Sequence, residues 1–182
     1  MPAVTGRLRR RADGVPVVSY RRTFRLSPDE VWAWLSEPDR LRAWLGEWRA
    51  AEDGRSMFRF SADDAESPEF GFRVGVTDPG RFVSLAMVDD DGLEHWDLQV
   101  RLVPSREVPG GTDLLAEQAM TDPVMAPSVG ATCEFYWDRL VLVSQGRDAS
   151  RLDFDEYFLA QAPGYRSMFP LQRVAGTQAA DD

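Results

Sequence analysis

The chain has 182 residues, of which 43% are hydrophobic, and a formal net charge of −9. This length fits one domain of ordinary size with a real hydrophobic core. The acidic balance argues against a nucleic-acid partner, because binding to phosphates needs an excess of basic side chains. The longest apolar runs are far shorter than the ~20 residues that span a bilayer, so we expect no membrane insertion and a cytoplasmic location.

Rare residue types restrict the chemistry further. Cys133 and His95 are the only cysteine and histidine, and the sequence contains no lysine. One cysteine excludes an intramolecular disulfide, and the scarcity of histidine and cysteine argues against a metal site. The absence of lysine excludes Schiff-base catalysis. We therefore predict no metal and no cofactor.

The N-terminal segment is basic, since residues 1 to 25 hold seven arginines and one aspartate. We expect residues 1 to 14 to be a disordered basic N-terminus, with an interaction arm as the alternative. Residues 15 to 26, "VPVVSYRRTFRL", are rich in Val, Tyr, Thr and Phe and predict the first strand.

The next segment begins with a strong helix signal. Ser27 is a suitable N-cap, Pro28 follows at the first helical position, and Glu30 completes a capping box. Pro38 ends this helix, because the residue before a proline avoids the α region. Asp39 is expected to cap a second short helix.

Gly46 is expected to end that second helix. The two short helices together carry three of the six tryptophans, Trp32, Trp34 and Trp44. Large rings at helical spacing are typical of a packed core, but Trp44 and Trp48 could instead contact a ligand at the mouth of a cavity.

After Glu47 the hydrophobic period changes from about 3.6 to 2, which indicates strands. Short turn sequences separate the runs, so we predict an antiparallel meander with one dry face and one wet face. The predicted strands are residues 56 to 62, 69 to 76, 81 to 88, 93 to 103 and 112 to 120.

Residues 126 to 146 predict the last regular element, a helix of about 30 Å. It is apolar over much of its girth, so we expect the rest of the domain to surround it. The predicted domain covers residues 15 to 148, and residues 149 to 182 form a C-terminal extension, partly packed and then disordered.

The order of elements and several motifs point to one family. "RTFRLSPDEVWAWLSEPDRLRAWLG", "GGTDL", "YWDRL" and "DFDEYF" together resemble the branch of the SRPBCC (START-like) superfamily named for the activator of heat-shock-protein-90 ATPase. The resemblance covers about residues 18 to 160. It implies an α+β helix-grip fold, in which a curved antiparallel sheet wraps a long C-terminal helix and two short helices close one end.

This fold implies a cavity between the sheet and the long helix, where apolar walls with a few polar groups would hold a small molecule. The alternative is that the same side chains fill the space completely. The candidate lining consists of Trp44, Trp48, Phe58, Phe60, Phe72, Trp96, Leu98, Tyr136 and Trp137.

Catalytic groups are few. Glu117 and Gln118 are adjacent in one strand, so one of them must point inward. An inward Glu117 would acquire a raised pKa by desolvation and could transfer protons, whereas an outward Glu117 would pair with an arginine. His95 is expected on the face opposite Trp96, toward solvent, and Cys133 is expected to be an inert core residue.

Three functions follow from the resemblance. The first is a binding module for a hydrophobic small molecule. The second is a cyclase- or hydrolase-like enzyme acting on an aromatic or polyketide-type substrate, and the third is a co-chaperone-like regulator of a heat-shock-protein-90 ATPase. We expect binding rather than catalysis, because no catalytic constellation stands out, and we leave a protein partner open.

Overall fold

The structure is a computed structural model and describes residues 4–50, 56–61, 69–89, 91, 94–120, 122 and 124–169, apart from the side chains of residues 95 and 96. Its largest element is an eight-stranded antiparallel sheet with the strand order β1-β2-β8-β7-β6-β5-β4-β3. The strands are β1 (Arg7–Arg10), β2 (Pro16–Phe24), β3 (Gly46–Ala50), β4 (Ser56–Phe60), β5 (Phe70–Asp78), β6 (Phe82–Val88), β7 (Glu94–Pro104) and β8 (Thr112–Ala119).

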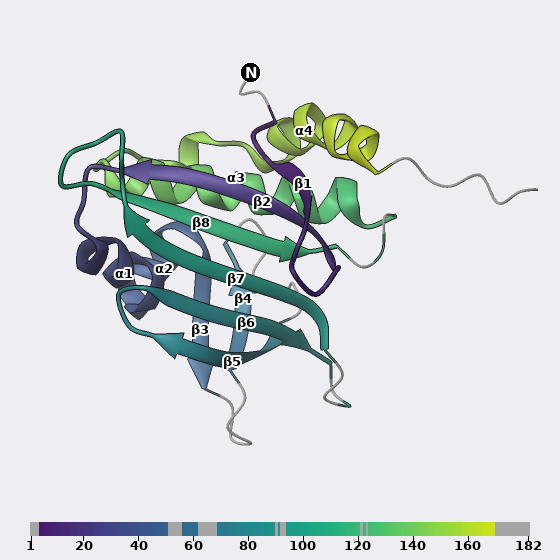
Figure 1. Cartoon of the computed structure of the whole chain (residues 1–182), viewed down its shortest axis with the longest axis horizontal. Helices are drawn as coiled ribbons and strands as arrows, with labels where there is room; N and C mark the ends of the chain where they lie inside the picture. Colours follow the sequence, from purple (N-terminus) through teal and green to yellow (C-terminus); the bar gives the residue numbers. More distant parts are fainter. Residues whose placement is uncertain are drawn as a thin grey trace, which may run out of the picture.

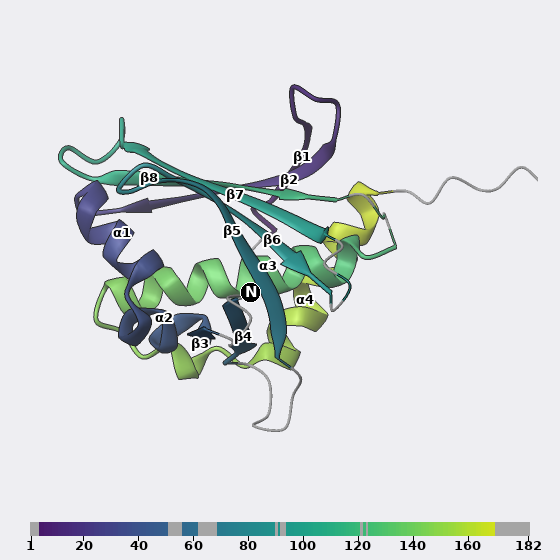
Figure 2. The same cartoon turned by 90° about the horizontal axis from the view of Figure 1, so that it is seen from below.

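Four α-helices and one 3-10 turn accompany the sheet in the described part of the chain. They are α1 (Pro28–Ser36), α2 (Pro38–Trp44), α3 (Ala126–Ser144), η1 (Ala149–Arg151) and α4 (Phe154–Met168). The sheet curves around α3, with α1 and α2 at one end of that helix and α4 along its other half (Figures 1 and 2). The predicted α+β helix-grip fold, a curved antiparallel sheet around a long C-terminal helix, is confirmed.

Helix α1 begins as the sequence indicates. The Ser27 hydroxyl accepts a hydrogen bond from the Glu30 N–H at 3.3 Å, and the Glu30 carboxylate accepts one from the Ser27 N–H at 2.8 Å. The start of α2 differs from the prediction, since Glu37 is its N-cap and Asp39 lies inside the first turn. Pro38 already has the fixed φ of a first helical residue, so α2 begins there without a capping side chain.

Helix α3 is buried on two sides, as its apolar girth predicts. One side faces the sheet, and the other packs against α4, where the Phe135 ring meets Phe154 at 5.1 Å and Tyr157 at 5.5 Å between centroids. The C-terminal extension therefore contributes a second helical layer. Residues 170 to 182, which were expected to be disordered, lie outside the described part, and the domain boundaries remain a prediction.

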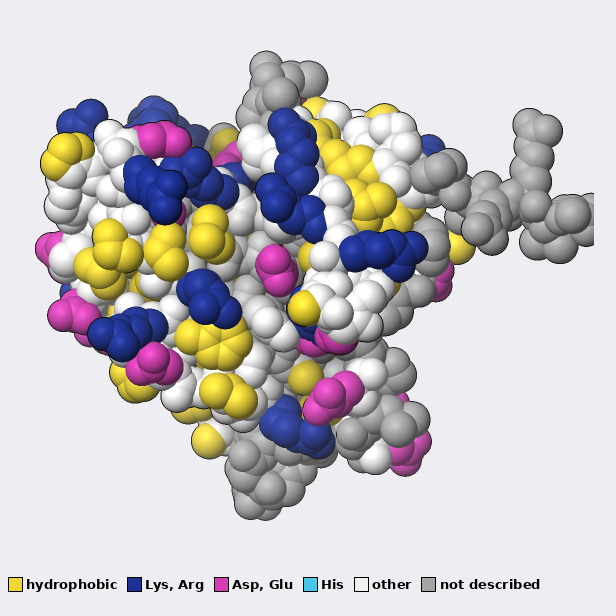
Figure 3. Space-filling model, viewed as in Figure 1, with side chains coloured by type: hydrophobic (Ala, Val, Ile, Leu, Met, Phe, Trp, Pro, Cys, Tyr) yellow, Lys and Arg dark blue, Asp and Glu magenta, His cyan; other side chains and the backbone are white. Residues whose placement is uncertain are grey.

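The basic segment at residues 7 to 10 is a strand rather than the expected disordered arm. It pairs with β2 from Arg7 opposite Ser19 to Arg10 opposite Pro16, and all four of its residues are exposed. Arginine side chains gather over this edge strand (Figure 3). Hydrophobic periodicity could not reveal it, because its pairing is made by the backbone, and charged edge strands resist further strand addition.

Two differences from the predicted strands affect the inner face of the sheet. Strand β3 follows α2 directly, although its exposed side chains gave no strand signal. In β5 the pairing with β6 shifts between Val74 and Thr77, and Val76, an apolar residue at the end of the predicted strand 69 to 76, is 69% exposed. Among the described helices, none is both long and apolar enough to cross a bilayer.

Candidate ligand-binding site inside the curved sheet

One row of side chains crosses five strands on the inner face of the sheet, which faces α3. Directly opposite residues in an antiparallel pair point to the same face, so the pairing register defines the row. We call it the inner row, and its members from β2 to β5 are Val18, Gln118, Leu98, Leu85 and Val74.

Burial falls steadily along the inner row. Val18 and Gln118 are 0% exposed and Leu98 is 6% exposed, whereas Leu85 is half-buried and Val74 is 51% exposed. Among the described residues, the pairs between β4 and β5 run from Phe70 to Phe72 and do not include Val74. Within the described part of the chain, the inner face is closed over β2, β8 and β7 and open at Val74, which we call the open edge of β5.

Four of the predicted lining residues meet beside this open edge. The Phe60 ring lies 5.0 Å from Phe58, 6.4 Å from Phe72 and 5.2 Å from Tyr136, measured between ring centroids. Phe58 is 6% exposed, whereas Phe60 and Phe72 are half-buried. Tyr136 belongs to α3, so this aromatic cluster connects the helix with strands β4 and β5.

Trp44 and Trp137 form a different part of the interior. Their rings stack at 5.8 Å, and the exposed fractions are 2% for Trp44 and 5% for Trp137. The Trp44 indole donates to the backbone oxygen of Trp34 at 2.9 Å, and the backbone oxygen of Trp44 accepts from Arg139 Nε at 2.9 Å. Trp44 thus anchors α2 to α3, which is the core role rather than a place at a cavity mouth.

Two predicted lining residues remain. Trp48 is 44% exposed on β3, opposite Phe58, so it lies on the rim of the inner face. The side chain of Trp96, like that of His95, lies outside the described part, although its backbone pairs with Met87. The structure therefore brings the aromatic cluster and the Trp44–Trp137 stack to the inside of the sheet, but it does not place Trp48 there as a buried contact.

The alternation of β8 decides between its two adjacent polar residues. Gln118 is the inward one, and its side-chain amide donates to the backbone oxygens of Asp97 and Ala119 at 3.1 Å. Glu117 lies on the outer face, opposite Ser19 and Gln99. Proton transfer by Glu117 required this side chain to point inward, and it points outward, so the structure does not support that hypothesis.

Cys133 behaves as expected. It lies on α3 near the side-chain amide oxygen (Oε1) of Gln118, with a sulfur to oxygen distance of 3.9 Å. Burial raises the pKa of the Cys133 thiol to about 12. The thiol is therefore protonated at neutral pH and is a poor nucleophile.

A buried ion network was not anticipated from the sequence. Arg22 of β2 contacts Glu134 at 2.8 Å and Asp138 at 2.7 Å, both on α3. Tyr165 donates to Glu134, and Tyr157 donates to Asp138 at 2.6 Å. The spacing of Glu134 and Asp138, one turn apart on an apolar helix, was the available signal, because buried carboxylates require cationic or hydroxyl partners.

A separate groove of about 710 Å³ lies on the surface between the start of α1, the β5–β6 turn and the end of β7. Asp29, Asp78, Arg81 and Arg101 line it together with Pro28 and Gly80. It shares no residue with the predicted lining, and its walls are charged, so it is not the apolar site that the sequence predicts.

A curved sheet that holds a long helix, with a helix pair at one end, defines a helix-grip domain. This chain belongs to the family described as activator of Hsp90 ATPase homolog 1-like protein, whose sequence model matches residues 25–141. The match confirms the resemblance to this branch of the SRPBCC superfamily. No curated protein sequence matches the chain.

Solved structures confirm the fold. CalU16 from Micromonospora echinospora has a TM-score of 0.69 at 20% identity over 93% of this chain and 99% of its own. EF2215 from Enterococcus faecalis, described as a conserved protein of unknown function, has a TM-score of 0.59 at 16% identity over 90% of this chain and 91% of its own. DynU16, described as a protein in the dynemicin biosynthetic locus, has a TM-score of 0.59 at 18% identity over 75% of this chain and 50% of its own.

Proposed function

We propose that this protein binds a hydrophobic small molecule on the inner face of the sheet, at the open edge of β5. The ligand would contact Phe60, Phe72 and Tyr136 of the aromatic cluster together with Leu85 and Val74. The observation that carries this proposal is the decline of burial along the inner row, from Val18 at 0% exposed to Val74 at 51% exposed.

An apolar ligand fits this surface for a simple reason. Burial of apolar area contributes roughly 25 cal/mol of favourable free energy per Å². A bound molecule would bury apolar area of the partly exposed aromatic and aliphatic side chains on this concave face and so bind favourably. The residues behind the surface, Trp44, Phe58, Leu98 and Trp137, are already buried and would serve as a rigid wall. Trp48, half-exposed on β3, would form the rim.

The proposal is for binding, not for catalysis. A cyclase- or hydrolase-like activity needs a proton-transfer group within about 3 Å of the substrate. Glu117, the carboxylic acid offered by the sequence, lies on the opposite face of the sheet from the proposed site. A regulatory role toward a heat-shock-protein-90 ATPase has the family name as its support and no specific contact in this chain.

The location of the site can be tested with Val74→Asp. A carboxylate on the inner face would have to be desolvated beside an apolar ligand, so we expect affinity for the neutral dye Nile red to fall about tenfold or more. Leu159→Asp is the matched control, because Leu159 is 73% exposed and belongs to α4, which packs on α3. Dye fluorescence gives both affinities, and an equal loss in the two variants would contradict the proposal.

Native mass spectrometry of freshly purified protein tests occupancy directly. The intact mass is compared with the denatured mass, and an added small mass that disappears on denaturation would identify a bound molecule and give its formula. Loss of this added mass in Val74→Asp, and its retention in Leu159→Asp, would assign it to the inner face.

A further inference from the structure

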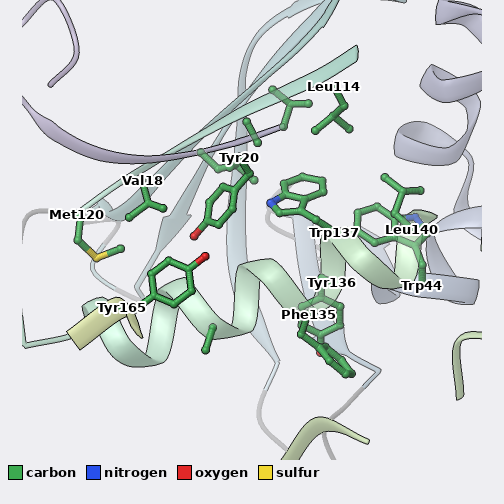
Figure 4. Close-up of a cluster of buried hydrophobic side chains, with 14 of the residues drawn as sticks. Val18, Tyr20, Trp44, Leu114, Met120, Phe135, Tyr136, Trp137, Leu140 and Tyr165 are labelled. Carbon is green, nitrogen blue, oxygen red and sulfur yellow. The ribbon is translucent and has the colours of Figure 1, made fainter. Parts of the chain in front are cut away.

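The indole nitrogen of Trp137 is a buried hydrogen-bond donor that lacks an acceptor. Trp137 is 5% exposed, and its Nε1 atom has no hydrogen-bond partner among the residues that the structure describes. Figure 4 shows this nitrogen on the side of the ring that faces Tyr20 and away from Trp44, in the space between α3 and the sheet. The donor is therefore directed inward.

Two polar side chains on the same face of the sheet form hydrogen bonds with other groups. The Tyr20 hydroxyl donates to the backbone oxygen of Gly130 at 3.4 Å, and the Gln118 amide donates to two backbone oxygens. Trp44, which stacks on Trp137, shows the ordinary solution, because its own indole N–H is bonded to a backbone oxygen. A buried N–H without a partner is destabilising and is rare in folded proteins.

We propose that the molecule bound by this protein carries a neutral acceptor oxygen, such as a carbonyl, that receives the Trp137 indole N–H. This inference rests on the proposed function, and it narrows the ligand class from hydrophobic molecules to oxygenated, uncharged, mainly apolar molecules. Tyr136 and Trp137 are consecutive on α3, but their side chains leave the helix in different directions, so a ligand that reaches this donor must extend from the aromatic cluster toward Tyr20.

The charge of the ligand follows from its surroundings. Five side chains that face α3 from β7 and β8 are apolar and at most 6% exposed, and Gln118 beside them is polar but uncharged; the five are Leu98, Val100, Leu102, Leu114 and Ala116. An ionised group among them would lose its hydration without a counter-ion. A carbonyl loses less hydration than an ionised group. The Trp137 N–H would replace the hydrogen bond to water that the carbonyl loses on entering the site.

The test compares two probes of the same shape, 1-tetralone and tetralin, which differ in one carbonyl oxygen. Dissociation constants are measured for the wild-type chain and for Trp137→Phe, which keeps an aromatic ring but removes the donor. We expect the Trp137→Phe substitution to weaken the binding of 1-tetralone about three- to tenfold more than the binding of tetralin. Comparing ratios cancels the packing change and the different hydration of the probes.

A second measurement avoids dependence on the fold of the variant. In the wild-type protein, the indole N–H proton resonance of Trp137 should move downfield on titration with 1-tetralone and much less with tetralin. Binding of both probes with an unchanged ratio and no selective shift would overturn this inference and leave the proposed function standing, with a water molecule as the partner of the indole. Failure of both probes to bind would overturn both proposals.

Discussion

At the scale of single residues, Gly130 allows helix α4 to pack closely on α3, because it has no side chain. Tyr165 of α4 is 0% exposed and lies in a slot between Gly130 of α3 and Gly6. A methyl group at either glycine would lie less than 3.0 Å from atoms of the Tyr165 ring. The slot therefore lets the tyrosine hydroxyl reach the Glu134 carboxylate.

Gly130→Ala should consequently destabilise the protein, by about 1 to 3 kcal/mol, because the Tyr165 ring has to move out of a tightly packed position. Helix propensity alone predicts the opposite, a gain of about 1 kcal/mol from replacing a glycine in a helix interior. Urea unfolding measures the change in the free energy of unfolding.

The matched background for this test is Tyr165→Ala, which empties the slot. There Gly130→Ala should be neutral or stabilising, since helix propensity is then the remaining effect. The same loss of stability in both backgrounds would show that the slot is not its source.

At the scale of elements, helix α4 depends on its contacts more than on its sequence. It contains Pro163 in its interior, and a proline there removes one backbone hydrogen bond. Asp153 caps the helix by accepting from the Glu156 N–H at 2.8 Å, and Tyr157 and Tyr165 fix it to the carboxylates of α3. Packing therefore maintains a helix that the local sequence disfavours.

Pro163→Ala should raise the free energy of unfolding, by about 1 to 3 kcal/mol, because the exposed position can then complete its helical hydrogen bond. Pro28→Ala is the matched control. Pro28 is the first residue of α1, where the missing N–H has no helical partner in any case, so we expect less than about 0.5 kcal/mol. Thermal or urea unfolding distinguishes the two variants, and a loss of stability in Pro163→Ala would contradict this prediction.

At the scale of the whole molecule, the buried ion network joins parts of the chain that are far apart in sequence. Glu134 accepts hydrogen bonds from the backbone N–H groups of Thr5 and Gly6 at 3.2 Å, from Arg22 of β2 and from Tyr165 of α4. Burial raises the pKa of Glu134, but hydrogen bonds from the side chains of Thr5, Tyr165 and Arg22, with the Arg22 charge, lower it more, so the pKa lies below its usual value. The ionised carboxylate is therefore the stabilising form.

The pH dependence follows from that direction. A carboxylate whose pKa is lower in the folded than in the unfolded chain stabilises the fold above the unfolded pKa, and this stabilisation is lost as pH falls toward the folded pKa. Glu134→Gln should cost about 3 kcal/mol at pH 7, because it leaves the buried Arg22 with one carboxylate fewer.

The difference in the free energy of unfolding between wild type and Glu134→Gln should narrow below about pH 4. There the Glu134 carboxylate of the unfolded wild-type chain begins to bind a proton. Urea unfolding from pH 7 to pH 3 gives both curves. Glu156→Gln, at an exposed site of α4, should follow the wild type at every pH. Parallel curves for wild type and Glu134→Gln would exclude Glu134 as a source of the acid sensitivity.

Prediction of the candidate site from sequence was partial. Phe58, Phe60, Phe72 and Tyr136 were among the candidate lining residues, and the structure groups these four. Alternation could not choose between Glu117 and Gln118, because that choice depends on which face of the sheet meets α3. The exposure of Val74 was equally inaccessible, since it depends on which distant parts of the chain cover the inner face of β5.

The sequence by itself determined the order of the elements, the capping box of α1, the apolar girth of α3 and the family, because periodicity, caps and turns are local properties. The tertiary structure decided what depends on partners distant in the chain. Backbone pairing made a strand of the charged segment Arg7–Arg10, and packing made a helix of Phe154–Met168 around an internal proline. The closure of one half of the inner face and the isolation of the Trp137 N–H likewise depend on how sheet and helices meet.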